Sequence, residues 1–214
     1  MKSQVLQLIN QHRIVAILRL DDLSQAIAIS EALASGGIVV QEFTLTNPDA
    51  LKVVREVKES LDRRGLATAI GIGSVRNVDE AGAALKAGAD FIVSPITSRP
   101  IIEACVKAGV TVMPGALTPS EIASAWDAGA DLVKVFPARG LGPNYIKDIL
   151  APMPYLKLMP TGGVDLNNLQ SYFAAGAVAA GIGGNLMDAA AIARGDWPAV
   201  TATAQQYAQA ARHA

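Results

Sequence analysis

Lys134 has an unusual position, because it lies between Val133 and Val135 in an apolar run that ends at Pro137. Strands of a parallel sheet are buried on both faces, so a lysine inside one needs an explanation. Burial disfavours an ammonium and leaves some neutral amine, which can attack a carbonyl and form a Schiff base. The alternative is a lysine at a strand end that keeps its ammonium in water. The apolar residues on both sides favour the catalytic interpretation.

A carboxylate, Glu42, lies within a second apolar run at residues 38–46. Near a lysine that forms a carbinolamine, a carboxylate can transfer protons during dehydration and can later protonate an enamine. The alternative is a structural ion pair with Lys134 or with Arg19. Glu42 is therefore a candidate acid and base, and both interpretations stay open at this point.

Arg19 and two glycine clusters are candidates for binding substrate anions. Arg19 follows the apolar run 14–18, and a guanidinium there can hold a carboxylate or a phosphate through two parallel hydrogen bonds. The clusters are Pro-Thr-Gly-Gly-Val at 160–164 and Gly-Ile-Gly-Gly-Asn at 181–185. Glycines let backbone N–H groups approach an anion closely. The alternatives are a solvated loop arginine and two ordinary tight turns.

A repeating unit must position these residues: a helical pattern ends at a small-residue turn, and a short apolar strand follows. Eight such strands, alternating with helices, predict one α/β domain over 1–214, a single (β/α)8 barrel or TIM barrel. A doubly wound open sheet is less favoured, because 71–75 lacks the full GxGxxG pattern. The expected strands are 14–18, 38–46, 67–71, 91–95, 110–114, 131–137, 156–159 and 178–184.

Charge and composition limit the partners that we expect. The chain has 214 residues and a formal net charge of -1, without a basic run, so a nucleic-acid partner is not expected. No apolar run approaches the ~20 residues of a membrane span, and residues 1–13 are amphipathic rather than typical of a signal peptide. We therefore expect a cytoplasmic protein with no membrane partner.

Cysteine and histidine patterns give no indication of a metal centre. The single cysteine, Cys105, cannot form an internal disulfide, and its apolar helical surroundings favour a buried structural role over a reactive thiol. No HxH, HExxH or CxxC pattern occurs in the chain. We therefore expect neither a metal ion nor a cofactor, which separates this chain from metal-dependent aldolases.

Taken together, the motifs resemble the class I aldolases that act on 2-keto-3-deoxy-6-phosphogluconate (KDPG) and 4-hydroxy-2-oxoglutarate (KHG). The matching segments lie in the family's order over nearly the whole chain. They are IVAILR at 14–19, EFTLTNPDA at 42–50, GIGSV at 71–75, FIVSP at 91–95, MPGALTPSE at 113–121, VKVFPA at 133–138 and PTGGV at 160–164.

The resemblance implies that Lys134 forms the Schiff base and that Glu42 is the acid and base. It implies reversible cleavage of KDPG to pyruvate and glyceraldehyde 3-phosphate, and in part of the family cleavage of KHG to pyruvate and glyoxylate. Ser74 would lie near the pyruvate carboxylate, and the enzyme would be a homotrimer. The residues expected to contact the 2-oxo acid are Arg19, Thr44, Thr46, Ser74, Pro95, Phe136, Thr161, Gly162, Gly163, Gly183 and Gly184.

Several positions depart from the family's usual residues. Ile72 replaces an alanine, Ser74 a threonine, and Arg139 a glutamate, while Gly184 stands where a serine is frequent and Thr46 where some members have arginine. We expect Ile72, Arg139 and Gly184 to touch the end of the pocket that holds the aldehyde half. The identity of that half is therefore open.

Three alternatives follow from the same residues. A related lyase would act on a non-phosphorylated 2-oxo acid, or would decarboxylate oxaloacetate through the same imine. An isomerase or synthase on a phosphate-binding barrel would not need Lys134. An inert barrel that serves as an oligomeric scaffold would form no adduct with pyruvate, and it is disfavoured because buried charges in strands are costly without a role.

Overall fold

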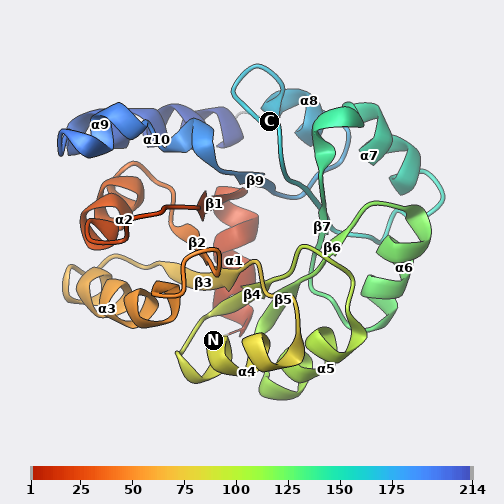
Figure 1. The fold of residues 1–214 in the computed structure, drawn as a ribbon. Helices are drawn as coiled ribbons and strands as arrows, with labels where there is room; N and C mark the ends of the chain where they lie inside the picture. The colour runs from red at the N-terminus through yellow and green to blue at the C-terminus, as the bar shows by residue number, and fades with distance from the viewer. Residues whose placement is uncertain (1, 213–214) are drawn as a thin grey trace.

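The computed structural model describes residues 2–212 as a closed ring of parallel strands surrounded by helices (Figure 1). In chain order, each barrel strand is followed by a helix that returns the chain to the start of the next strand. The strands are β1 (Ile14–Leu18), β2 (Val40–Thr44), β3 (Ala69–Gly73), β4 (Phe91–Val93), β5 (Thr111–Met113), β6 (Gly115–Ala116), β7 (Val133–Val135), β8 (Leu158–Pro160) and β9 (Ala180–Ile182).

The helices lie outside this ring, apart from the first. They are α1 (Lys2–His12), α2 (Ala26–Ser35), α3 (Ala50–Arg63), α4 (Val78–Lys86), α5 (Arg99–Ala108), α6 (Pro119–Asp127), α7 (Gly142–Leu150), α8 (Leu169–Ala174), α9 (Ala189–Ala193) and α10 (Trp197–Arg212), with the 3-10 turns η1 (Ala138–Gly140) and η2 (Gly184–Leu186). Within the described residues, no helix combines the length and the apolar composition that crossing a bilayer requires.

The nine β-segments form eight barrel strands, because β5 and β6 are two parts of one strand. They are separated at Pro114, which has no N–H to donate to a neighbouring strand. β5 pairs with β4, and β6 pairs with β7, so this strand joins the six-stranded and three-stranded sheets. On the other side, Val178 donates to Leu158 and a bridge joins Thr161 to Gly181. The predicted (β/α)8 barrel is confirmed.

The bounds of several strands differ from the prediction. The third strand was expected at 67–71 but spans Ala69–Gly73, because pairing begins where Ala69 donates to Val39. The amide of Leu66 is instead bonded to Leu61 at the end of α3, which leaves two connecting residues. A shift of two residues keeps each side chain on its predicted face.

Side chains on the strands alternate between the barrel interior and the helix-covered exterior. On β3, Ile70 and Ile72 belong to the outer core that also contains Ile29, Val54 and other helix residues. The expectation that Ile72 touches the aldehyde half is therefore wrong, because its side chain is fully buried between the sheet and the helices. Gly71 and Gly73 occupy the alternate, inward positions.

A separate apolar cluster fills the barrel below the strand ends, and α1 contributes to it. Val5, Leu8 and Ile9 of α1 pack with strand residues that include Val15 and Phe91. The polar side chains that line the cavity lie at the opposite, carboxyl end of the strands, whereas the buried Thr111 begins β5 at the amino end. Cys105 lies in the outer core, fully buried, and burial raises the pKa of its thiol to about 11. The structural interpretation of Cys105 is confirmed.

Replacing Gly71 by alanine should destabilise the barrel, because a Cβ there would lie 2.4 Å from two ring carbons of the buried Phe91. Overpacking of this kind costs roughly 1–3 kcal/mol in free energy of unfolding. Gly82→Ala is the matched control: a Cβ on this α4 residue meets nothing within 4 Å. In a helix interior that change should stabilise by about 0.5–1 kcal/mol. Urea unfolding measures both, and equal midpoints for the two variants would contradict the packing described.

Candidate active site

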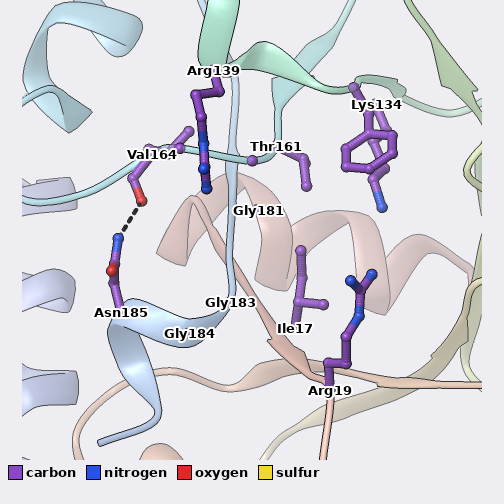
Figure 2. A pocket seen from close by; sticks show the side chains of 13 residues that line it. Ile17, Arg19, Lys134, Arg139, Thr161, Val164, Gly181, Gly183, Gly184 and Asn185 are labelled. Atoms are coloured by element: carbon purple, nitrogen blue, oxygen red, sulfur yellow. Dashed lines mark hydrogen bonds between the residues drawn. The ribbon is translucent and has the colours of Figure 1, made fainter. Parts of the chain in front are cut away.

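A cavity of about 340 Å³ opens at the carboxyl ends of β7, β8, β9 and β1 (Figure 2). This is the end of a (β/α)8 barrel where active sites lie. The residues that line it are Ile17, Arg19, Lys134, Phe136, Arg139, Thr161, Gly162, Gly163, Val164, Gly181, Gly183, Gly184 and Asn185. The structure thus brings together Lys134, Arg19, Phe136 and both glycine clusters, as the sequence predicted.

Lys134 extends from β7 into this cavity, and only 6% of the residue is exposed. Its backbone is fixed on both sides, since the N–H of Lys134 donates to the carbonyl of Pro114 on one side and β7 pairs with β8 on the other. Its Nζ lies 4.9 Å from the centroid of the Phe136 ring, two residues further along the same face. The amine is therefore held on a strand, beside an aromatic face, with little water around it.

Glu42 lies on the inner face of β2 and is only 1% exposed. Neither carboxylate oxygen has a hydrogen-bond partner within residues 2–212. Burial raises the pKa of the Glu42 carboxyl above its ordinary value of 4.5, while the charges of Lys134 and Arg19 oppose that rise. A carboxyl in such surroundings can hold a proton at higher pH than usual, which is what an acid and base requires.

Gly73 explains why the Glu42 carboxyl fits at this position. A Cβ on Gly73 would lie 1.7 Å from Oε1 of Glu42, so the carboxyl rests directly on the backbone of β3. The structural ion pair considered for Glu42 is absent: in the described part of the chain, Glu42 forms no direct salt bridge. Lys134 and Arg19 act on it only through their charge.

The lining of the cavity is cationic. Arg19, Lys134 and Arg139 all contribute to it, and none of the other lining residues is acidic. In Figure 2 the nitrogen ends of Lys134 and Arg19 point toward each other on one side, while Arg139 enters from the side of Val164 and Asn185. Such a surface attracts substrates with negative charge at both ends.

Two glycine loops form the wall nearest to Arg139. Gly162 and Gly163 have φ angles of 90° and 81°, in the left-handed region that glycine adopts at little cost. Asn185 donates to the carbonyl of Val164 at 3.1 Å, so the loop after β9 is tied to the loop after β8. The glycine clusters therefore lie side by side, as anion binding by both would require.

Some of the predicted residues do not line the cavity, and Glu42, which lies behind it, is one of them. Thr44 is buried, with its hydroxyl 2.8 Å from that of Thr46, and Thr46 is exposed. Ser74 directly follows β3 and has a φ of 60°, which is uncommon for a residue other than glycine. Pro95 packs its carbonyl against Gly115. Their contacts with substrate stay predictions.

Sequence reasoning did not identify Ile17 as a lining residue. It included Val164, Gly181 and Asn185 in the two glycine clusters but predicted no substrate contact for any of them. Ile17 and Gly181 each precede a predicted residue, Arg19 or Gly183, by two positions on the same strand face, and that period could have found them. Asn185 and Val164 lie in loops, where no period applies. Within residues 2–212, no three His, Cys, Asp or Glu side chains form a set that could hold a metal ion.

Comparisons with known proteins find similarity over nearly the whole chain. A family model described as KDPG and KHG aldolase matches residues 5–203. The 2-dehydro-3-deoxy-phosphogluconate aldolase of Treponema pallidum is 32% identical over 206 residues, which cover 96% of each chain.

Solved structures show the same fold. The structure of native KDPGal is 30% identical, with a TM-score of 0.84 and coverage of 94% of both chains. The KDPG aldolase of Legionella pneumophila, which holds pyruvate as a covalent carbinolamine, is 27% identical with a TM-score of 0.83, over 92% of this chain and 95% of that one.

Replacing Glu42 by glutamine should change how stability depends on pH. Because the folded state raises the pKa of this carboxyl, the folded state binds its proton more tightly than the unfolded chain does. The wild type should therefore lose free energy of unfolding, relative to Glu42→Gln, as pH rises above about 4.5. Urea unfolding of both proteins between pH 4 and pH 8 measures this, with exposed Glu59→Gln as the control that follows the wild type. Parallel curves for wild type and Glu42→Gln would contradict the buried, unpartnered carboxyl.

Proposed function

Because the chain belongs to the KDPG and KHG aldolase family, a family of carbon–carbon lyases, we propose that it reversibly cleaves KDPG to pyruvate and glyceraldehyde 3-phosphate. It also acts, in this proposal, on KHG to give pyruvate and glyoxylate. The observation that carries the proposal is the pair of Lys134 and Glu42, both buried at the cavity end of the barrel. Amine and carboxyl together can form and break an imine without a metal.

Lys134 is the nucleophile in this scheme. The lone pair of its Nζ attacks C2 of the 2-oxo acid, and loss of water gives a protonated imine. The C4 hydroxyl then loses its proton, the C3–C4 bond breaks, and the bonding electrons move into the imine to give an enamine. The aldehyde leaves, the enamine takes a proton at C3, and hydrolysis of the imine releases pyruvate and restores the amine.

Glu42 transfers the protons. Its buried carboxyl has a raised pKa, so it can donate a proton when water leaves the carbinolamine and can accept one when the C4 hydroxyl ionises. Because no described residue occupies its oxygens with a hydrogen bond, neither oxygen has to lose a partner for that exchange. Arg19, at the same side of the cavity as Lys134, holds the carboxylate of the pyruvate half (Figure 2).

Oligomeric state and location belong to the same proposal. We infer a homotrimer in the cytoplasm. A designed cage made by fusing symmetric oligomeric domains contains a domain that this chain matches at 30% identity over 72% of the cage chain, which supports a symmetric assembly. The single, buried cysteine fits a reducing compartment. Sedimentation of the purified protein measures the assembly.

Lys134→Met should abolish catalysis without unfolding the barrel. Loss of the nucleophile should lower kcat/KM for KDPG by about a thousandfold or more, since the remaining groups cannot form the imine. Exposed Lys107→Met on α5 is the matched control and should retain wild-type kinetics. A coupled assay for pyruvate release measures all three proteins. Normal turnover by Lys134→Met would show that the imine does not form on Lys134, whereas no pyruvate release by the wild type would favour an isomerase or synthase on the same barrel.

The preferred substrate follows from a comparison of kcat/KM for KDPG, KHG and oxaloacetate. The cationic cavity predicts the highest value for KDPG, because a phosphorylated substrate gains from charge at both ends. The difference from KHG should be at least about tenfold, the effect of one charge-assisted hydrogen bond of roughly 1.5 kcal/mol or more. Fastest turnover of oxaloacetate would instead identify a decarboxylase that uses the same imine.

A further inference from the structure

We propose that Arg139 binds the phosphate of the aldehyde half and so makes this site selective for phosphorylated 2-oxo acids. The inference rests on the proposed function. It assigns to Arg139 the phosphate end of the substrate, whereas the Schiff base at Lys134 holds the pyruvate end. Arg139 forms no salt bridge with any carboxylate in the described part of the chain. Its charge in the cavity is therefore unmatched by the protein.

The charge of the cavity favours the binding of a second anion. The cavity is lined by three cationic side chains, Arg19, Lys134 and Arg139. Glu42 lies behind the cavity, and the charges of Lys134 and Arg19 oppose the rise in the pKa of its carboxyl. Once the amine has become a neutral or protonated imine, the pyruvate carboxylate offsets one guanidinium. The other guanidinium then attracts a second anion. Because Arg19 and Arg139 are both exposed at the mouth of the cavity, this anion adds binding affinity and is not needed to offset a buried charge.

The position of Arg139 places that anion away from the reacting carbonyl. Lys134 and Arg19 lie on one side of the cavity, and Arg139 lies on the other, next to Val164 and Asn185 (Figure 2). A substrate whose C2 is bonded to Lys134, and whose carboxylate is held by Arg19, must direct its remaining carbons toward Arg139. The terminal group of the aldehyde half is therefore what Arg139 meets.

The backbone of Arg139 is held firmly by its surroundings. The amide of Ala138 donates to Thr161 at 2.9 Å, and the Tyr172 hydroxyl donates to the carbonyl of Ala138 at 3.3 Å. The aliphatic stem of Arg139 lies against Gly163: a Cβ added to Gly163 would lie 2.9 Å from the Cβ of Arg139. These contacts hold the backbone and the Cβ of Arg139, while the residue as a whole is exposed, so its guanidinium can turn toward an anion in the cavity.

The space beside Arg139 suits a phosphate better than a carboxylate. Gly162 and Gly163, with positive φ, and Gly183 and Gly184 bring backbone N–H groups to the same wall of the cavity. A Cβ on Gly184 would meet nothing within 4 Å, so there is room for a tetrahedral group. A guanidinium can donate two parallel hydrogen bonds to two phosphate oxygens, which leaves a third for the backbone.

Two measurements test this assignment in wild type, Arg139→Ala and Arg139→Lys. The first is calorimetric titration with glycerol 3-phosphate, which carries the phosphate but has no carbonyl to react. The second is kcat/KM for KDPG and for its phosphate-free counterpart, 2-keto-3-deoxygluconate. Borohydride trapping of pyruvate on each protein reports separately whether the Schiff base forms.

Arg139→Ala should weaken glycerol 3-phosphate binding and lower kcat/KM for KDPG by about ten- to a hundredfold, mainly through KM. The phosphate-free substrate should change by about twofold or less, because it has no group for Arg139 to bind. Arg139→Lys should recover part of the loss, since an ammonium keeps the charge but not the paired hydrogen bonds. Arg19→Ala is the contrasting variant and should lower kcat/KM for both substrates alike.

Equal binding of glycerol 3-phosphate by wild type and Arg139→Ala would overturn the assignment, as would an equal loss on both substrates. Failure of the wild type to trap pyruvate would instead overturn the proposed function. The titration with glycerol 3-phosphate needs no Schiff base, so it still decides the role of Arg139 in that case.

Discussion

The structure depends on placing an amine and a carboxyl at the carboxyl end of a barrel whose interior is mainly apolar. Lys134 and Glu42 are almost completely buried, they form no direct salt bridge within the described residues, and Glu42 has no hydrogen-bond partner there. Buried groups of this kind are destabilising, and they occur most often where a reaction needs them. The rigid strands on which both lie hold them in place despite that cost.

Glycine makes this arrangement possible at close range. Gly73 leaves room for the Glu42 carboxyl, Gly71 for the Phe91 ring, and Gly181 for Thr161, whose Oγ1 would lie 2.3 Å from a Cβ. Each of these glycines occupies an inward position on its strand. The absence of a Cβ there lets the side chain of a neighbouring strand lie directly against the glycine backbone.

The sequence predicted the barrel, the end at which the site lies, and the shared face of Lys134 and Phe136, because each follows from a local period. Even the two-residue error in β3 kept the inward face correct. The period did not reveal that Glu42 rests on the backbone of β3, since that contact joins separate strands. The expectation for Ile72 was wrong because it came from a difference from related sequences and not from the period, which puts Ile72 on the outward face with Ile70. No strand period reaches Asn185, which lies in the turn η2 after β9.

The most direct test of the central claim is to identify the atom that pyruvate modifies. The protein is incubated with pyruvate, reduced with borohydride, digested, and the modified peptide is sequenced by mass spectrometry. A Schiff base at the cavity predicts a single reduced adduct on the side chain of Lys134, absent when borohydride is omitted. An adduct on any other lysine, or none at all, would contradict the account.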